Sequence, residues 1–222
     1  MSSSLYSPQV AEVLRRLFAA AEENDPKVLA SIRTGNEGAP TDEELVQEVL
    51  GKAYIPVSPE GGRFLYILAR SQRSQLIVEF GTSFGISTIH LAAAARDNKT
   101  CRVVSAEKHP EKVKQARKNL TDAGLAEYVE VREGDAMKTL ANLDAEIDFL
   151  FLDGWKDLYL PVLRMLEPRL RAGAVVVADD LNLFPEVLKP YLEYVRNPKS
   201  GYTSVEILLG DGIELSLRTA KT

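Results

Sequence analysis

The chain has 222 residues, 27 Lys and Arg against 32 Asp and Glu, a formal net charge of -5, and a single cysteine, Cys101. One cysteine cannot form an intramolecular disulfide, and no stretch approaches the roughly 18 apolar residues that span a bilayer, so a disulfide-stapled scaffold and a membrane protein are both disfavoured. The acidic balance also argues against a dedicated nucleic-acid binder. The opening MSSSLYSPQV lacks the basic start and apolar run of a signal peptide, so we expect a cytoplasmic protein.

The first helix is expected over residues 7–25. Ser7 can cap it and Pro8 suits the first helical position. Apolar side chains recur there at spacings of three and four, at Val10, Val13, Leu14, Leu17 and Phe18. This pattern predicts an amphipathic helix.

Two shorter helices are predicted next. One covers residues 26–32 and ends in the turn-rich TGNEGAP. The other covers residues 41–50, where Thr41 and Glu44 have the spacing of a capping box. We expect these pieces to cover a core that is built later in the chain.

Short apolar runs follow, and five of them are typical of strands: residues 75–80, 102–107, 128–133, 147–153 and 174–180. The first four are separated by stretches able to hold helices, and this alternation predicts a parallel sheet. Residues 204–210 and 213–219 flank Asp211-Gly212, a turn signal for two antiparallel strands. The sequence therefore predicts an α/β fold with a mostly parallel seven-stranded sheet, a C-terminal antiparallel hairpin and N-terminal helices.

Carboxylates occur at one strand end after another, at the edge where parallel sheets bind ligands. They are Glu79 before the loop GTSFG, Glu107, Asp135, Asp153, and the pair Asp179 and Asp180. Each could instead cap the helix that follows it. Their ordered recurrence after a glycine loop favours a common site.

The chemistry of this edge favours S-adenosylmethionine as the cofactor. A dinucleotide usually requires Gly-x-Gly-x-x-Gly to hold its phosphates, whereas the loop here runs from Gly81 to Gly85 as Gly-x-x-x-Gly, and an acidic rim repels a pyrophosphate. S-adenosylmethionine carries a ribose diol, an amino-acid end and a cationic sulfonium, without phosphate. Glu107 can accept both ribose hydroxyls, and Asp135 is placed to meet the adenine edge.

A metal site is predicted beside the cofactor. Asp153 ends one strand, and Asp179 and Asp180 end the next, so carboxylate oxygens can converge on one hard cation, for which Mg²⁺ is the natural choice. Lys156 follows Asp153 closely enough to reach a substrate oxygen bound by that cation.

Several segments resemble the cation-dependent, catechol O-methyltransferase-like family: YIPVSPEGGRFL, EFGTSFGISTIHLA, AEKHP, EGDA, FLDGWKDLYLP and VVADD. The resemblance runs from about Tyr54 to the C-terminus, and FLDGWKDLYLP is its most specific part. It implies a Rossmann-like methyltransferase fold in one domain, residues 1–222. Residues 1–52 would form a helical cover or lid, and residues 53–222 the cofactor-binding and catalytic core.

The resemblance also implies roles for individual residues. Mg²⁺ would be held by Asp153, Asp179 and Asp180, with Lys156 as the catalytic base. The cofactor site would be lined by Val57, Glu79, Gly81, Ser87, Glu107, Asp135 and Asp153. Glu206 is the nearest match to an acidic residue that holds a substrate hydroxyl in the family. Trp155, Tyr159 and Tyr54 are either flat walls for the substrate or aromatics of the core or lid.

One position departs from the family pattern, because Asp180 stands where the family usually has Asn. Three carboxylates around a dication sum to about -1, and the extra negative charge should weaken the pull of the metal on a substrate proton. Two interpretations remain open. Either the metal site works with lower acidity, or Asp180 has another role.

The resulting hypothesis is Mg²⁺-dependent methyl transfer from S-adenosylmethionine to a small aromatic diol, because chelation of two neighbouring hydroxyls fixes which oxygen faces the methyl group. One alternative is a tRNA methyltransferase on the same fold, which requires a basic surface beside the pocket. Another is a cofactor-binding relative without turnover. We expect neither a nucleic-acid nor a membrane partner, and a monomer or a homodimer.

Overall fold

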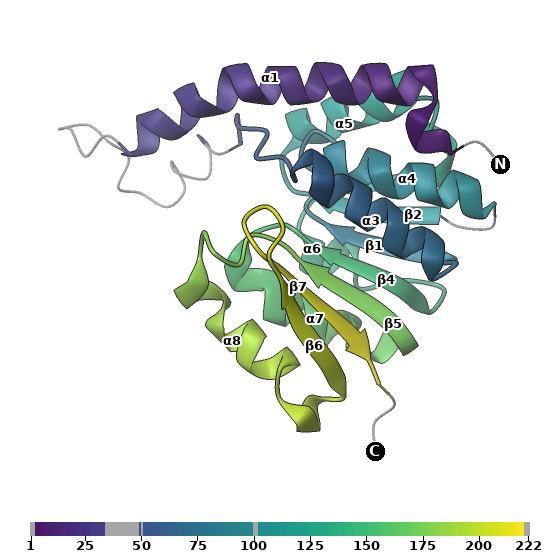
Figure 1. Cartoon of the computed structure of the whole chain (residues 1–222), viewed down its shortest axis with the longest axis vertical. Helices are drawn as coiled ribbons and strands as arrows, with labels where there is room; N and C mark the ends of the chain where they lie inside the picture. Colours follow the sequence, from purple (N-terminus) through teal and green to yellow (C-terminus); the bar gives the residue numbers. More distant parts are fainter. Residues whose placement is uncertain (1–2, 34–48, 50, 100–101, 220–222) are drawn as a thin grey trace.

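Within residues 3–33, 49, 51–99 and 102–219, which the computed structural model describes, seven strands form one sheet in the order β3-β2-β1-β4-β5-β7-β6 (Figure 1). The strands are β1 (Leu76–Phe80), β2 (Arg102–Glu107), β3 (Val129–Glu133), β4 (Ile147–Leu152), β5 (Leu170–Ala178), β6 (Tyr202–Ile207) and β7 (Ile213–Arg218). Strands β1 to β5 pair in parallel, and β7 pairs antiparallel with both β5 and β6. The predicted sheet and hairpin are confirmed, with β5 beginning earlier than expected.

Helices cover both faces of the sheet. They are α1 (Pro8–Arg33), α3 (Pro59–Ser71), α4 (Ile86–Asn98), α5 (Pro110–Asp122), α6 (Ala136–Thr139), α7 (Tyr159–Leu166) and α8 (Pro185–Val195). Short 3₁₀ turns occur at Ser4–Tyr6, Ala126–Tyr128, Lys156–Leu158, Glu167–Arg169 and Pro198–Ser200. The first four helices share one apolar cluster with one face of the sheet, and α6, α7 and α8 share a second cluster with the other face. The fold is therefore a three-layer α/β arrangement.

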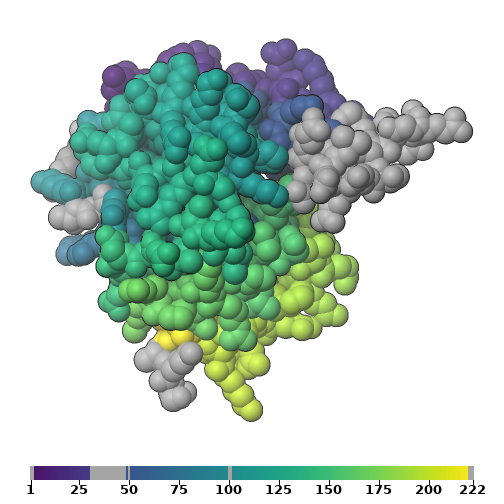
Figure 2. Space-filling view, turned by 180° about the vertical axis from the view of Figure 1, so that it is seen from behind, coloured from purple at the N-terminus to yellow at the C-terminus, as the bar shows by residue number. Residues whose placement is uncertain are grey.

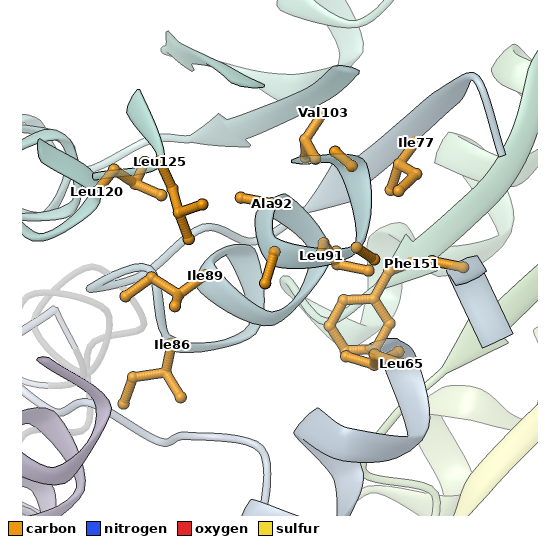
Figure 3. Close-up of a cluster of buried hydrophobic side chains, with 14 of the residues drawn as sticks. Leu65, Ile77, Ile86, Ile89, Leu91, Ala92, Val103, Leu120, Leu125 and Phe151 are labelled. Atoms are coloured by element: carbon orange, nitrogen blue, oxygen red, sulfur yellow. The ribbon is translucent and has the colours of Figure 1, made fainter. Parts of the chain in front are cut away.

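Helix α4 forms the centre of the first layer. Its segment AAAA, residues 92–95, is fully buried, because α4 lies between the sheet, α3 and α1. Small side chains allow neighbours on several sides to approach closely, and a helix buried all round needs no polar stripe. Figure 3 shows Ile89 and Leu91 of α4 with Leu65 of α3 and Phe151 of β4 in this cluster.

The N-terminal residues form one long helix instead of the two predicted over residues 7–25 and 26–32. Helix α1 continues through Pro26 and packs across α4 and α5. Proline removes one helical N–H bond, but residue 26 is exposed, so water can reach the backbone there. Viewed from behind, α1 lies along the top of the molecule (Figure 2). Within the described part of the chain, no helix has both the length and the apolar character to cross a membrane.

One further prediction and the single cysteine lie outside the described residues. The expected helix over residues 41–50, with the capping box of Thr41 and Glu44, belongs to a stretch of which only residue 49 is described. Cys101 is also outside the described ranges.

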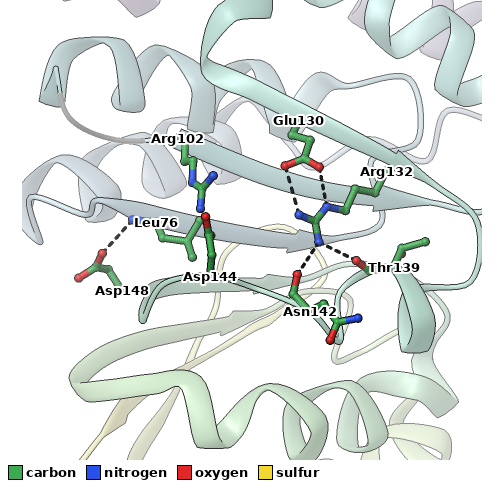
Figure 4. A network of polar contacts seen from close by, with 8 residues as sticks. All are labelled: Leu76, Arg102, Glu130, Arg132, Thr139, Asn142, Asp144 and Asp148. Carbon is green, nitrogen blue, oxygen red and sulfur yellow. Dashed lines mark hydrogen bonds and ion pairs between the residues drawn. The ribbon is translucent and has the colours of Figure 1, made fainter.

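Polar contacts tie together the amino ends of the strands, on the edge away from the acidic series. Asp148 of β4 accepts the N–H groups of Gln75 at 2.7 Å and Leu76 at 2.9 Å, and Arg171 donates to the same carboxylate. Figure 4 shows the Asp148 contact to Leu76 beside the ion pair of Arg102 with Asp144. These contacts fix the strand register without occupying the functional edge.

Candidate active site

The candidate site lies at the carboxyl ends of β1 and β4, where the chain order of the sheet reverses. Strand β1 leads into the glycine loop, residues 81–85, and β4 leads into Asp153. The Asp153 N–H donates to the Phe80 carbonyl at 2.8 Å, which holds the two strand ends side by side. In open α/β sheets, such a reversal separates the loops on either side and leaves a crevice for ligands.

Two glycines allow these strand ends to approach each other. A Cβ on Gly81 would lie 2.5 Å from the Asp153 carbonyl oxygen, and a Cβ on Gly154 would lie 2.5 Å from the Phe80 ring. Gly81 also has a φ of 104°, which other residues rarely adopt. Packing against β4 therefore requires glycine at position 81.

A small hollow opens between the glycine loop and the segment that precedes α3. Its lining includes four of the predicted cofactor residues, namely Val57, Gly81, Ser87 and Asp153. Tyr54 and Phe84 also line it, and their rings stack with centroids 4.0 Å apart. The hollow is thus lined by the backbone of the glycine loop, an aromatic pair and one carboxylate.

Glu107, at the end of β2, is held by backbone donors on both of its oxygens. Its Oε2 accepts the Ser83 N–H at 2.8 Å, and its Oε1 accepts the His109 N–H at 2.9 Å. A carboxylate has about four acceptor positions, so one remains on each oxygen. The side chain is therefore fixed beside the glycine loop in a form that can still accept a diol.

Glu79 lies beneath the hollow and is fully buried. Its carboxylate accepts the hydroxyls of Ser87 at 2.6 Å, Thr88 at 2.5 Å and Ser105 at 2.5 Å. Burial raises the pKa of this carboxyl, while the three hydroxyl donors oppose the rise. Glu79 therefore acts on the hollow through Ser87, whose hydroxyl it orients.

Asp135 adopts the helix-capping role that was the alternative for each strand-end acid. Its Oδ1 accepts the Met137 N–H at 2.9 Å at the start of α6, and the residue is exposed. Its placement at the adenine edge stays a prediction.

Three carboxylates converge at the ends of β4 and β5. One oxygen from each of Asp153, Asp179 and Asp180 lies within 4.8 Å of the other two. Successive side chains of a strand point to opposite faces, but the backbone turns after β5. Asp180 has a φ of 66°, in the left-handed region that Asp tolerates, and its N–H donates to Asp179 Oδ1 at 2.9 Å. The turn allows both neighbours to reach Asp153.

Lys156 lies among these carboxylates. Its Nζ is 2.6 Å from Asp180 Oδ2 and 3.3 Å from Asp153 Oδ1, and it donates to the Tyr159 hydroxyl at 2.7 Å. The predicted metal ligands and the predicted base are thus brought together in one cluster.

The cluster carries an excess of negative charge. Burial raises the pKa of Asp153 well above its ordinary value and that of Asp179 to about 7, and the repulsion from Asp180 adds to both shifts. Burial would lower the pKa of Lys156, but the surrounding Tyr159, Asp153 and Asp180 outweigh it and raise that pKa well above its ordinary value. One ammonium cannot neutralise three carboxylates, so a divalent cation would stabilise their ionised forms.

The donor set fits Mg²⁺. This ion prefers oxygen ligands at about 2.0–2.1 Å in octahedral geometry, which places neighbouring ligand atoms about 3 to 4 Å apart. Three carboxylate oxygens within 4.8 Å of one another need only a small movement to satisfy that geometry. Asp153, Asp179 and Asp180 are therefore the residues that would hold the ion.

Known proteins are similar to this chain in both sequence and fold. A family model described as a methyltransferase domain matches residues 78–181. The chain is 35% identical over 135 residues to a catechol O-methyltransferase of Niastella koreensis. This alignment covers 59% of this chain and 60% of that protein. It is 38% identical over 128 residues to a catechol O-methyltransferase of Mycobacterium tuberculosis. This alignment covers 57% of each protein. The matched region thus spans somewhat more than half the length of these curated relatives.

The structural comparison adds a longer match. The O-methyltransferase TomG of Streptomyces achromogenes, solved in complex with S-adenosylmethionine, is 27% identical, with a TM-score of 0.69 over 89% of this chain and 97% of that one. In sequence and fold, the chain is thus similar to class I S-adenosylmethionine-dependent O-methyltransferases.

Two of the three predicted aromatic walls, Trp155 and Tyr159, differ in burial. Tyr159 is fully buried, with its ring edge-on to Phe80 and Tyr191, so the prediction of a substrate wall is wrong for this residue and its alternative as a core aromatic is correct. The ring belongs to the second apolar cluster, and its hydroxyl accepts a hydrogen bond from Lys156 at 2.7 Å. Trp155 is half-buried against the second apolar cluster and stays a candidate for the wall.

Glu206 is engaged away from the carboxylate cluster. Its carboxylate lies 3.1 Å from the Arg196 guanidinium of α8, and its cross-strand neighbour is Glu214. Arg196 forms ion pairs with both acids. The structure therefore does not group Glu206 with the three aspartates.

Sequence reasoning missed two charged residues beside the site. Asp211 lies in the hairpin turn, close enough for its charge to contribute to the raised pKa of Asp179 after burial and Asp180. Lys112 of α5 is buried, with its Nζ 5.4 Å from the centre of the Phe84 ring. Asp211 was interpreted only as a turn residue, and Lys112 belongs to a charged helix that is typical of a solvated face.

Proposed function

We propose that this chain is a Mg²⁺-dependent methyltransferase that methylates one hydroxyl of a small catechol-like substrate with S-adenosylmethionine. The main observation in support of the proposal is that Asp153 belongs to two neighbouring sites. It lines the hollow beside the glycine loop, and it belongs to the group of three carboxylates. One residue thus connects the cofactor hollow with the carboxylates that would hold the cation, so a methyl donor in the hollow would lie beside an acceptor at the cluster.

The reaction needs an ionised oxygen as its nucleophile. A phenol has a pKa of about 10, so ionisation at neutral pH costs about 4 kcal/mol. When bound, Mg²⁺ supplies the Lewis acidity that lowers this cost, and S-adenosylmethionine supplies the methyl group. The chain contributes by holding the two reactants in contact, since positioning alone can remove a large part of a bimolecular barrier.

Lys156 is the group that would accept the phenolic proton. Its Nζ already lies 2.6 Å from one aspartate oxygen of the cluster, and the Tyr159 hydroxyl fixes its direction. Tyr159 in turn donates to the Asp179 carbonyl at 3.3 Å. Once the carboxylate charge is neutralised, burial favours the uncharged amine, which is the form able to take a proton.

The glycine loop and Glu107 would bind the cofactor. Glu107 has an acceptor position left on each oxygen for the ribose diol, and the loop backbone approaches the hollow without side chains at Gly81 and Gly85. The acidic surroundings favour a cationic sulfonium over a phosphate-bearing ligand.

The substrate class rests on the cluster and on the relatives. Two adjacent aromatic hydroxyls can chelate one ion, and two similar proteins are named catechol O-methyltransferases. Trp155 would provide a flat contact for the ring.

The test is methyl transfer from labelled S-adenosylmethionine to catechol. We expect turnover with Mg²⁺, loss of turnover with a chelator, and recovery when Mg²⁺ is restored. Unmodified tRNA serves as the comparison substrate and should accept no label. Turnover that is indifferent to the chelator, or labelling of tRNA alone, would contradict the proposal.

A further inference from the structure

A buried carboxylate attaches the segment before α3 to α1. Asp25 of α1 is 9% exposed. Its Oδ1 accepts the Tyr54 N–H and its Oδ2 accepts the Ile55 N–H, each at 2.8 Å. The neighbouring Asn24 side chain donates to the Lys52 carbonyl at 2.9 Å. The last turns of α1 therefore hold a loop that lies far along the sequence.

The loop is held in a strained conformation at the same point. Ile55 has a φ of 44°, in the left-handed region, which is unusual for a β-branched residue. Such a conformation costs about 1–3 kcal/mol and persists only where the surroundings enforce it. The two N–H groups bound by Asp25 belong to Ile55 and to the residue before it, so this carboxylate is placed to enforce the conformation.

The other side of the loop forms a wall of the cofactor hollow. Tyr54, Ile55, Pro56 and Val57 all line it. The Ser83 hydroxyl of the glycine loop donates to the Tyr54 carbonyl at 3.0 Å, and the Tyr54 ring stacks on Phe84. The wall is therefore connected to α1 on one side and to the glycine loop on the other.

We propose that Asp25 is a positioning residue for cofactor binding, which holds the Tyr54–Val57 wall against the glycine loop from outside the hollow. The inference rests on the proposed function, since it takes S-adenosylmethionine as the occupant of the hollow. Asp25 does not line the hollow itself, so its effect passes through the backbone of Tyr54 and Ile55. A preformed wall reduces the ordering that a ligand must otherwise impose on binding.

The test compares Asp25→Ala with Glu22→Gln, which removes an exposed acid from the same helix. The binding of S-adenosylhomocysteine is measured by calorimetry, together with Mg²⁺ binding and turnover at saturating cofactor. We expect the dissociation constant for S-adenosylhomocysteine to rise about tenfold or more in Asp25→Ala, with Mg²⁺ affinity and kcat close to those of the parent chain. Glu22→Gln should match the parent in all three.

Asp25→Asn is the second variant, because it keeps one acceptor oxygen and should fold if Asp25→Ala does not. It should show an intermediate loss of affinity. Hydrogen exchange should speed up at the Tyr54 and Ile55 amides in either variant, while the amides of α4 stay protected.

An unchanged dissociation constant despite faster exchange at these two amides would overturn the role of Asp25. Equal losses in cofactor affinity, Mg²⁺ affinity and kcat would also overturn it, because they indicate general destabilisation. If the parent chain itself fails to bind S-adenosylhomocysteine, the proposed function fails and this role fails with it. If the parent chain binds S-adenosylhomocysteine and the Asp25 variants bind it equally well, only the role of Asp25 is contradicted and the proposed function stands.

Discussion

Asp153 occupies the position on which the two halves of the site depend. It follows β4, where Gly81 and Gly154 let the neighbouring strand end approach, and its carboxylate meets Asp179, Asp180 and Lys156. The residue types around it are those of a cation site, and burial, with a smaller contribution from the charges of Asp180 and Asp179, raises the pKa of Asp153. Residue-scale changes here should therefore separate metal binding from proton transfer.

Lys156→Met should remove proton transfer and leave binding intact. We expect kcat to fall about 100-fold or more, the usual range for loss of a general base. The dissociation constant for S-adenosylhomocysteine should change little, because Lys156 does not itself line the hollow and contacts its lining only at Asp153. Lys189→Met, at an exposed lysine of α8, is the control. Equal losses in kcat and cofactor affinity would indicate a structural lysine.

Asp180→Asn tests whether the third carboxylate is a ligand. The amide keeps an oxygen donor but removes one negative charge, so the Mg²⁺ dissociation constant should rise roughly tenfold. Turnover should persist at saturating Mg²⁺, because fewer anions leave the ion more acidic toward a bound hydroxyl. Mg²⁺ affinity equal to that of the parent chain in calorimetry would show that Asp180 has another role.

Among the elements of the fold, the strands could be predicted best from the sequence, because each short apolar run was compatible with only one kind of element. The run IDFLFL, residues 147–152, is buried throughout, as expected for a short apolar strand with helices on both faces of the sheet. The order of strands and the carboxyl-end position of the acids follow from that alternation. The carboxylates of Asp153, Asp179 and Asp180 could be placed together for the same reason.

Other features depend on tertiary contacts that local patterns do not encode. Pro26 favours a break in the helix, yet α1 continues because its packing on α4 and α5 and its link to Tyr54 hold the helix in place. Glu79 and Asp135 look alike in sequence, but one is buried under three hydroxyls and the other caps a helix. Tyr159 could not be assigned to wall or core before its neighbours were known.

The amino ends of the strands should be sensitive to Asp148→Ala. This change leaves the Gln75 and Leu76 N–H groups without their acceptor and removes the partner of Arg171. We expect a loss of about 2 to 4 kcal/mol in the free energy of unfolding, measured by urea denaturation. Asp144→Ala removes an exposed ion pair with Arg102 and should cost much less. Similar losses in both variants would contradict this assignment.

For the whole molecule, His90 should contribute a pH dependence of stability. The ring is buried beneath Gly62, its Nδ1 lies 2.8 Å from the Ile86 carbonyl, and burial lowers its pKa from 6.5 to about 4. Between these values the unfolded chain binds the extra proton, so stability should fall as pH decreases from 6.5 toward 4. The contribution is at most about 3 kcal/mol.

Unfolding measurements of the parent chain and His90→Gln across this range isolate the effect. Asp179, with a pKa raised to about 7, contributes with the opposite sign in both proteins, because its protonated form is favoured in the folded state. The parent should therefore lose more stability than the variant as the pH falls. Parallel curves would show that His90 is not the group responsible.

The most direct measurement is a crystal structure of the full chain grown with Mn²⁺ and S-adenosylhomocysteine, in which the metal is located by its anomalous signal. We expect the metal peak among the carboxylates of Asp153, Asp179 and Asp180, with the nucleoside in the hollow beside Gly81. Saturating metal that leaves no peak between these aspartates, with Lys156 still bound to Asp180, would contradict a cation-dependent methyl transfer at this site.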